Sequence, residues 1–160
     1  FFGVKMHKFV WDTSAIVNIK ESNDDGYSPG RSLFKDLSDG WIDIDYQNIF
    51  PTLAVFEVNA TVSKLARKGK PVLREFYLLD DRALMYDVDQ ELIQKANQLF
   101  TLDGFDKLYG ADLVFACIAK IEDAYLVTMD RKLAMHASKH VKVIDLNESK
   151  SSPVYRALFE

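Results

Sequence analysis

Apolar and polar residues follow two different periods along this chain, one typical of strands and the other of helices. Short segments with strand-like character lie at residues 5–11, 41–46, 83–88, 124–128 and 141–146. Segments with helical character alternate with them, at residues 13–20, 31–37, 51–67, 71–79, 90–100, 110–121 and 131–138. Five strands separated by helices predict an α/β fold, a three-layer sandwich around a mainly parallel five-stranded sheet. Right-handed crossovers would place helices on both faces of that sheet.

Individual residues refine these boundaries. Pro51 suits the first turn of its helix, and Gly69 is placed to end that helix after residue 67. Residues 41–46 alternate apolar and acidic side chains, as a half-buried strand would. The helix at 110–121 is apolar almost all round, so we expect it to be buried. The inward-facing residues of the helix at 90–100 should be Leu92, Ile93, Ala96 and Leu99.

The composition is that of one globular domain. The chain has 160 residues, of which 48% are hydrophobic, enough to bury a sizeable core. We assign residues 1–146 to a single domain and residues 147–160 to a C-terminal tail. The single cysteine, Cys117, excludes an internal disulfide framework and fits a cytoplasmic protein. No apolar stretch approaches the ~20 residues of a membrane span, and the first residues lack the pattern of a secretory signal.

Four acidic residues stand beside apolar segments where an acid is unexpected. Asp12 and Asp130 each follow a predicted strand, Asp112 lies in the first turn of a predicted helix, and Glu57 lies within two turns of another helix start. Because helices run antiparallel to the strands in such folds, strand ends and helix starts share one edge of the sheet. All four acids are therefore expected at that edge, where open α/β sheets bind their ligands.

Each acid also has an ordinary structural explanation that must be weighed. Asp12, Asp112 and Asp130 stand at helix starts, where an aspartate caps free N–H groups and complements the helix dipole. For any one of them, capping alone is the better explanation. Glu57 lies inside an apolar stretch and has no cap to make. Capping therefore explains neither Glu57 nor the shared edge.

Four carboxylates close together repel one another, and a bound cation would relieve that repulsion. Hard oxygen ligands suit Mg²⁺ or Mn²⁺, which also bind phosphate oxygens. Such an ion activates water for phosphodiester hydrolysis without a protein nucleophile, and the chain offers no convincing nucleophile. The net charge of −4 gives no overall attraction for nucleic acid, so phosphate binding would need the metal or a local basic patch.

At these residues the chain resembles the PIN-domain ribonucleases, most closely the VapC-type toxins of toxin–antitoxin pairs. The matching pieces, in order, are Asp12-Thr13-Ser14-Ala15, Phe56-Glu57-Val58-Asn59-Ala60, Gly110-Ala111-Asp112-Leu113 and Thr128-Met129-Asp130-Arg131. Each piece alone is weak, but the ordered set is specific and extends over residues 7–146, nearly the whole chain.

The resemblance implies a PIN-like sheet of order 3-2-1-4-5. It also implies Mg²⁺ or Mn²⁺ held by Asp12, Glu57, Asp112 and Asp130, hydrolysis of single-stranded or loop RNA, an antitoxin partner and a homodimer. Thr128 would support Asp130 or a metal-bound water, with Ser14 and Asn18 as further polar groups. One departure concerns the second metal, because Arg131 and Lys132 stand where some members carry another acid.

The residues that would bind substrate are less clearly marked. Arg131 and Lys132 follow Asp130 directly and are the better candidates for phosphate contacts. The densest basic cluster comprises Lys64, Arg67, Lys68, Lys70 and Arg74, and it is either a solvated helix end or a track for RNA. His136 and His140 have zinc-like spacing but lack the accompanying glutamate, so a structural role is favoured. Isolated aromatic residues such as Tyr27, Tyr46 and Tyr109 more often belong to a core or its rim than stack on bases, so no role is assigned to them, although Tyr109 lies beside the predicted edge.

These patterns leave more than one function open. The leading hypothesis is a Mg²⁺- or Mn²⁺-dependent endoribonuclease, the toxin of a toxin–antitoxin pair. The alternative is a catalytically silent RNA- or protein-binding module on the same fold. A phosphoacceptor signalling domain is disfavoured because the paired acids near the end of its first strand are absent.

Overall fold

The sheet at the centre of the molecule is entirely parallel. The computed structural model describes residues 5–20, 27–69, 81–148 and 153–159. The strands are β1 (His7–Trp11), β2 (Tyr46–Pro51), β3 (Ala83–Tyr86), β4 (Tyr125–Thr128) and β5 (Val143–Asp145). They are arranged in the order β3-β2-β1-β4-β5, which confirms the expected sheet. The chain reverses its direction of travel across the sheet between β1 and β4, which pair directly.

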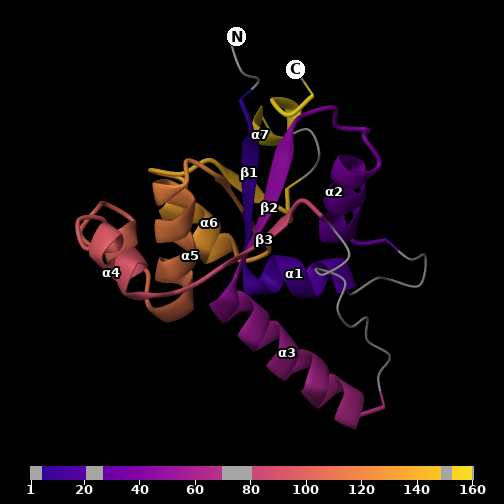
Figure 1. Ribbon diagram of the computed structural model, residues 1–160, viewed down its shortest axis with the longest axis horizontal. Helices are drawn as coiled ribbons and strands as arrows, with labels where there is room; N and C mark the ends of the chain where they lie inside the picture. The colour runs from indigo at the N-terminus through magenta and orange to yellow at the C-terminus, as the bar shows by residue number, and fades with distance from the viewer. Residues whose placement is uncertain (1–4, 21–26, 70–80, 149–152, 160) are drawn as a thin grey trace.

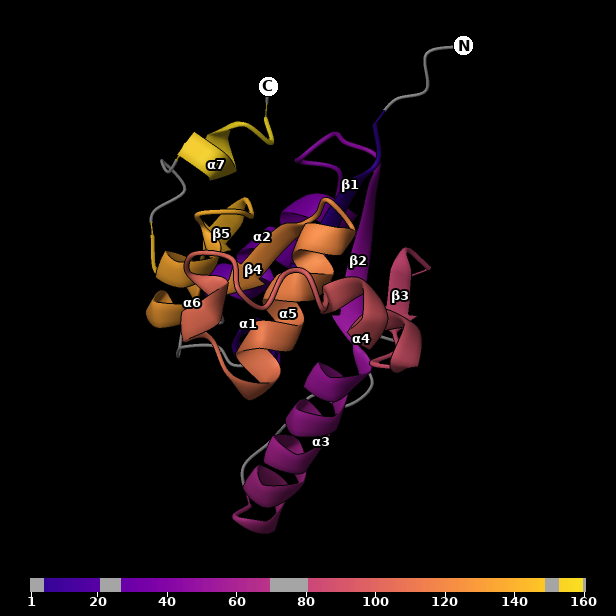
Figure 2. The same ribbon diagram turned by 90° about the vertical axis from the view of Figure 1, so that its left-hand side faces the viewer.

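Helices cover both faces of this sheet and make the three layers. They are α1 (Thr13–Lys20), α2 (Pro29–Ser38), α3 (Thr52–Arg67), α4 (Gln90–Ala96), the 3₁₀ turn η2 (Phe105–Lys107), α5 (Gly110–Ile121), α6 (Arg131–Ala137) and α7 (Pro153–Arg156). Figures 1 and 2 show α1 and α2 on one side of the sheet and α4 with α5 on the other. Both views show α3 starting at the lower end of the sheet and extending away from the body of the molecule.

The core lies where these layers meet the two central strands. Phe9, Val10 and Trp11 of β1 are fully buried, and every residue of β4 is buried. The buried indole of Trp11 donates a hydrogen bond to the side-chain oxygen of Asn48 at 2.9 Å, which satisfies both polar groups. The expected burial of α5 is confirmed for residues 115–119, whereas its first turn is only partly covered and Lys120 in its last turn is exposed.

The strand expected at residues 41–46 is wrong. The second strand is Tyr46–Pro51, which shares only Tyr46 with the predicted range. Burial does alternate from Ile42 to Tyr46, but the segment before Tyr46 is not paired with a neighbouring strand, so the alternation there does not mark a strand. Pro51 is the last residue of β2 and not part of the first turn of α3; its φ of −58° and ψ of 136° suit an extended residue.

Of the other predicted helix boundaries, several are confirmed and one is wrong. The starts and ends of α1 and α5 are confirmed, as is the end of α3 before Gly69, whose φ of +73° suits a helix end. The helix α4 stops at Ala96 and not at residue 100, and Ile93, expected to face inward, is 54% exposed. The predicted helix at 71–79 lies outside the described residues.

The C-terminal tail contributes to the core. Tyr155 on α7 is 5% exposed and donates a hydrogen bond from its hydroxyl to Asp36 at 3.1 Å, and Leu158 is 2% exposed. The helix α7 also contacts β5. Among the described residues, no helix combines the length and the apolar character needed to cross a bilayer.

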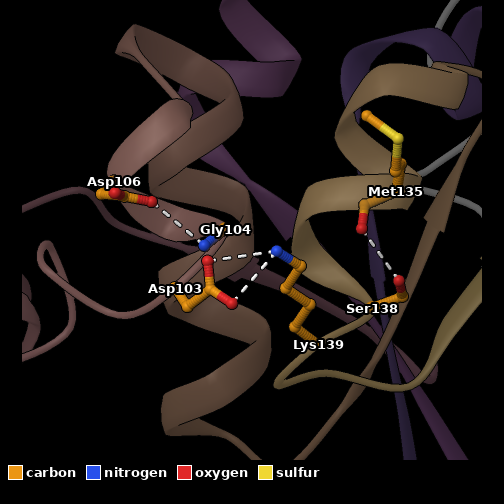
Figure 3. Close-up of polar contacts among 6 residues, drawn as sticks. All are labelled: Asp103, Gly104, Asp106, Met135, Ser138 and Lys139. Atoms are coloured by element: carbon orange, nitrogen blue, oxygen red, sulfur yellow. Dashed lines mark hydrogen bonds and ion pairs between the residues drawn. The ribbon is translucent and has the colours of Figure 1, made fainter.

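The turn before η2 is held tightly against the end of α6. Figure 3 shows Asp103 bonded through both carboxylate oxygens to the ammonium of Lys139, at 3.1 Å each. The intervening Gly104 has a φ of +96°, and a Cβ placed there would lie 2.2 Å from the carbonyl oxygen of His136. Only glycine can occupy this position without moving backbone.

Substitution of Gly104 by alanine should therefore be strongly destabilising. A left-handed conformation costs roughly 1–2 kcal/mol for a non-glycine residue, and forcing overlap with backbone adds about 1–3 kcal/mol. The matched control is Gly40→Ala, because Gly40 has a φ of +77° but no atom within 4 Å of its Cβ position. Urea unfolding should show the larger loss in Gly104→Ala; equal losses in the two variants would contradict the steric argument.

Candidate functional site

Asp12 is buried at the end of β1 and is held by hydrogen bonds to both carboxylate oxygens. It is 2% exposed. Its Oδ1 accepts hydrogen bonds from the Ser14 hydroxyl at 2.8 Å and from the Ala15 backbone N–H at 2.7 Å. Its Oδ2 accepts a hydrogen bond of 2.5 Å from Thr128 Oγ1. Asp12 therefore caps the start of α1, but capping occupies only one of its two oxygens.

Two hydroxyl groups tie the end of β1 to the end of β4. Thr128, fully buried, donates to Asp12 and accepts a hydrogen bond from the backbone N–H of Asp130 at 2.9 Å. Ser14 donates to Asp12 and accepts from the backbone N–H of Met129 at 2.9 Å. The two strand ends are therefore fixed next to each other by side chains as well as by the sheet.

One carboxylate oxygen of Asp130 and one of Glu57 accept hydrogen bonds from protein donors. Asp130 Oδ1 accepts from the backbone N–H groups of Lys132 at 2.9 Å and Leu133 at 3.0 Å, which caps α6. Glu57 on α3 is half-buried, and its Oε1 accepts a hydrogen bond of 2.6 Å from Thr13 Oγ1. From the sequence, Thr13 was assigned no role. The feature that could have indicated one is its hydroxyl group, which follows Asp12 directly at the start of a helix. This bond attaches α3 to α1.

The electrostatics show that the four acids belong to one group. Burial is the largest cause of the raised pKa of Asp112, and the charges of Asp130 and Glu57 raise this pKa further. Burial raises the pKa of Asp12 to about 6, against the lowering effect of its three hydrogen bonds, and the charge of Asp112 adds to the rise. We call Asp12, Glu57, Asp112 and Asp130 the acid group. Its members come from strand ends and helix starts at one edge of the sheet, as element order predicted.

The acid group offers oxygen donors of the kind that Mg²⁺ and Mn²⁺ prefer, and its mutual repulsion is what a cation would relieve. Within the described residues, however, no three Asp, Glu, His or Cys side chains stand in an arrangement that could hold a metal ion as they are. The acid group thus fits such a cation in the chemistry of its donor atoms but not in the present orientation of its side chains. Binding through three or more of them requires side chains of the acid group to rotate toward one another.

Asp12 should give the metal-free protein a pH-dependent stability. Its ordinary pKa of 3.8 rises to about 6 on folding, so the folded state favours the protonated form. The associated stabilisation is fully present below pH 3.8 and is lost as the pH rises through about 6. The difference between the two pKa values corresponds to a change of roughly 3 kcal/mol in the free energy of unfolding.

The measurement is urea unfolding of the wild type and of Asp12→Asn in EDTA across this pH range. We expect the free energy of unfolding of the wild type to fall relative to the variant by up to roughly 3 kcal/mol between about pH 4 and pH 7. A difference between the two proteins that stays constant with pH would contradict the raised pKa of Asp12.

The residues expected to bind substrate lie at different distances from the acid group. The charge of Lys132 lowers the pKa of Asp112, which places Lys132 close to the acids, and both Lys132 and Arg131 are exposed. Lys64 and Arg67 are exposed in the last turn of α3, and Lys68, which follows the helix, is exposed too. The other two members of that basic cluster, Lys70 and Arg74, lie outside the described residues.

Among the other candidate residues, Asn18 and Cys117 have structural roles. Asn18 accepts a hydrogen bond of 2.6 Å from the backbone N–H of Gly30, so it joins α1 to α2. Cys117 is buried in α5, and burial raises its pKa to about 11, which suits a core residue. His140 lies beyond the end of α6 and therefore does not share a helix face with His136. Tyr109 is 81% exposed immediately before α5.

Comparisons with known proteins identify the fold and nothing finer. No family model and no curated protein matches the chain. Among solved structures, VapBC2 from Rickettsia felis, bound to a DNA fragment from its promoter, aligns with a TM-score of 0.57 at 17% identity. That alignment covers 86% of this chain and 98% of the other. PAE2754 from Pyrobaculum aerophilum aligns with a TM-score of 0.51 at 18% identity, covering 89% of this chain and 93% of the other. The chain has a PIN-like fold.

Proposed function

We propose that this protein is a Mg²⁺- or Mn²⁺-dependent endoribonuclease that hydrolyses phosphodiester bonds in RNA. The observation that carries the proposal is the acid group at one edge of the sheet: the charges of Asp130 and Glu57 raise the pKa of Asp112, and the charge of Asp112 raises that of Asp12. A PIN-like fold supports it, because this edge of an open α/β sheet is where ligands bind.

The cation would be held by Asp12, Glu57, Asp112 and Asp130. When bound, it would supply a water of lowered pKa and would stabilise charge on the phosphate oxygens. Hydrogen bonds within the chain hold three of these acids at the sheet edge. Thr128 and Ser14 hold Asp12, Thr13 holds Glu57, and the start of α6 holds Asp130.

Exposed cations would bind the RNA backbone around the acid group. Lys132 and Arg131 are the nearest candidates, since the charge of Lys132 already reaches Asp112. Lys64 on the projecting helix α3 would contact a more distant part of the strand. Ser14 would act through Asp12 and not by touching RNA.

We further propose that the protein is the toxin of a toxin–antitoxin pair, with an antitoxin as partner and a homodimer as its assembled form. Support comes from the order of the acidic motifs along the chain and from the likeness in fold to VapBC2. A co-purification of the tagged chain with the product of an adjacent reading frame would test the partnership.

The enzymatic proposal is tested by incubating the purified protein with a panel of single-stranded and hairpin RNAs. Cleavage is expected with Mg²⁺ or Mn²⁺ and should stop on chelation with EDTA. Asp112→Asn should be inactive under the same conditions, whereas Asp39→Asn, an exposed acid outside the acid group, should cleave normally. Cleavage that persists in EDTA or in Asp112→Asn would overturn the proposal.

A catalytically silent RNA- or protein-binding module on this fold is the alternative. It is favoured by one observation: both oxygens of Asp12 are already bonded to protein donors, and the acids do not stand ready-made around a metal. Thermal unfolding distinguishes the two. A specifically bound Mn²⁺ must raise the melting temperature of the wild type and not of Asp112→Asn, whereas the silent module predicts no shift in either.

A further inference from the structure

A polar pocket lies at the opposite edge of the sheet from the acid group, where the parallel strands begin. It has a volume of about 240 Å³. Its walls come from the start of β1, the end of α5, the start of β4 and the segment before β5. We call it the lysine pocket, because Lys5, Lys8, Lys120 and Lys142 all line it.

The charge of this pocket opposes that of the whole chain. Four lysines line it against one acid, Asp123, in a protein whose net charge is −4. Lys5 forms an exposed ion pair with Asp123 at 3.4 Å, and Lys8 pairs with Glu122 at 3.1 Å. Lys120 and Lys142 have no carboxylate partner in the part of the chain that the structure describes; Lys142 instead lies 5.7 Å from the centre of the Tyr125 ring. Two exposed ammonium groups are therefore available to an anion.

Two histidines in the same wall carry buried nitrogens that lack hydrogen bonds. His7 and His140 both line the pocket. Nδ1 of His7 and Nε2 of His140 are the two buried side-chain nitrogen or oxygen atoms without a hydrogen-bond partner among the described residues. Because these two nitrogens are buried, they do not face the open pocket, and the two histidines line it through other atoms.

The helix dipole explains only part of this arrangement. The C-terminal end of α5 carries partial negative charge and favours Lys120 in its last turn. It does not explain Lys142, which precedes β5, or Lys5 and Lys8, which belong to the start of β1 and its lead-in. Cations contributed by three separate segments around one cavity are what the recognition of an anion requires.

We infer that the lysine pocket binds a phosphate group, with Lys120 and Lys142 as its charged contacts and with His7 and His140 in its wall. The volume of about 240 Å³ is below the roughly 300 Å³ at which pockets for drug-sized ligands begin, so it suits one or two phosphates and not a whole nucleotide. The phosphate would come from a free phosphorylated metabolite or from an RNA backbone. This site does not depend on the acid group or on nuclease activity.

The test is an NMR titration of the EDTA-treated full-length protein with pyrophosphate, following the imidazole signals of its histidines. The chain has three histidines, and His136 lies outside the pocket, so it is an internal control. Signals of His7 and His140 should shift while those of His136 stay unchanged. Lys120 and Lys142 are both exposed, so their replacement should leave the fold intact. The double variant Lys120→Gln/Lys142→Gln should bind pyrophosphate about tenfold more weakly, or weaker still.

A matched variant, Lys35→Gln/Lys107→Gln, removes the same charge from exposed sites outside the pocket and should bind pyrophosphate normally. A short 2′-O-methyl RNA, which cannot be cleaved, forms the second arm. Shifts with the RNA alone assign the phosphate to a nucleic-acid backbone, and shifts with pyrophosphate assign it to a free anion. Unshifted signals with both probes, or equal weakening in the two double variants, would overturn the inference.

Discussion

Asp12→Asn is expected to abolish metal-dependent RNA cleavage, lowering kcat/KM by about 1000-fold or more. The amide cannot carry the negative charge that a divalent cation needs, and the loss corresponds to about 4 kcal/mol of transition-state stabilisation. Asp12 is the most buried member of the acid group and is held by three hydrogen bonds, so little else can take its place.

The readout is initial cleavage rate with Mn²⁺ under single-turnover conditions, together with circular dichroism to confirm folding. Asp145→Asn is the matched control, because Asp145 also ends a strand of the same sheet but bonds locally to Asn147. It should retain most of the activity. An Asp12→Asn variant that is folded and still cleaves RNA at more than a few per cent of the wild-type rate would remove Asp12 from the proposed mechanism.

The gathering of the acids could be predicted from sequence because it follows from the direction of the elements. Once Asp12 and Asp130 are assigned to strand ends and Glu57 and Asp112 to helix starts, a parallel sheet leaves them one common edge. The pKa shifts that connect Asp112 to Asp130 and Glu57 are the physical expression of that arrangement. Their roles in metal binding and catalysis remain predictions.

The bonds that align the acids could not be predicted in the same way. Thr13 reaches Glu57 across two helices, and Ser14 joins Asp12 to Met129 over more than a hundred positions of sequence. Such contacts depend on tertiary packing, which periodicity does not report. The lysine pocket was missed for the same reason, because its cations come from segments that are distant in the sequence and individually look like solvated surface.

The misplaced strand shows how a local pattern can mislead. Residues 41–46 alternate in polarity, whereas the true β2 reads Tyr-Gln-Asn-Ile-Phe-Pro and does not alternate. A central parallel strand is covered on both faces, so five of the six residues of β2 are buried, including Asn48, whose side-chain oxygen accepts a hydrogen bond from Trp11. The buried partner of Asn48 cannot be seen in the local pattern, which therefore did not mark this core strand.

Thr128→Val is the second substitution with a large expected effect, because it removes a buried hydroxyl that serves two groups. Thr128 Oγ1 donates to Asp12 Oδ2 and accepts from the N–H of Asp130, and valine of similar size can do neither. Since the Thr128 hydrogen bond lowers the pKa of Asp12 against the effect of burial, its loss should raise that pKa above about 6. Metal binding and cleavage near neutral pH should then fall about 10- to 100-fold.

The distinguishing measurement is the pH profile of cleavage, because a purely structural defect would lower the rate equally at every pH. With Thr128→Val, the rise of activity with pH should move to higher pH, so that the loss is largest near pH 6 and smaller near pH 8. Thr128→Ser keeps the hydroxyl and should restore both the rate and the profile. If Thr128→Val lowers the rate by the same factor across this range, the hydroxyl stabilises the fold but does not set the charge of Asp12.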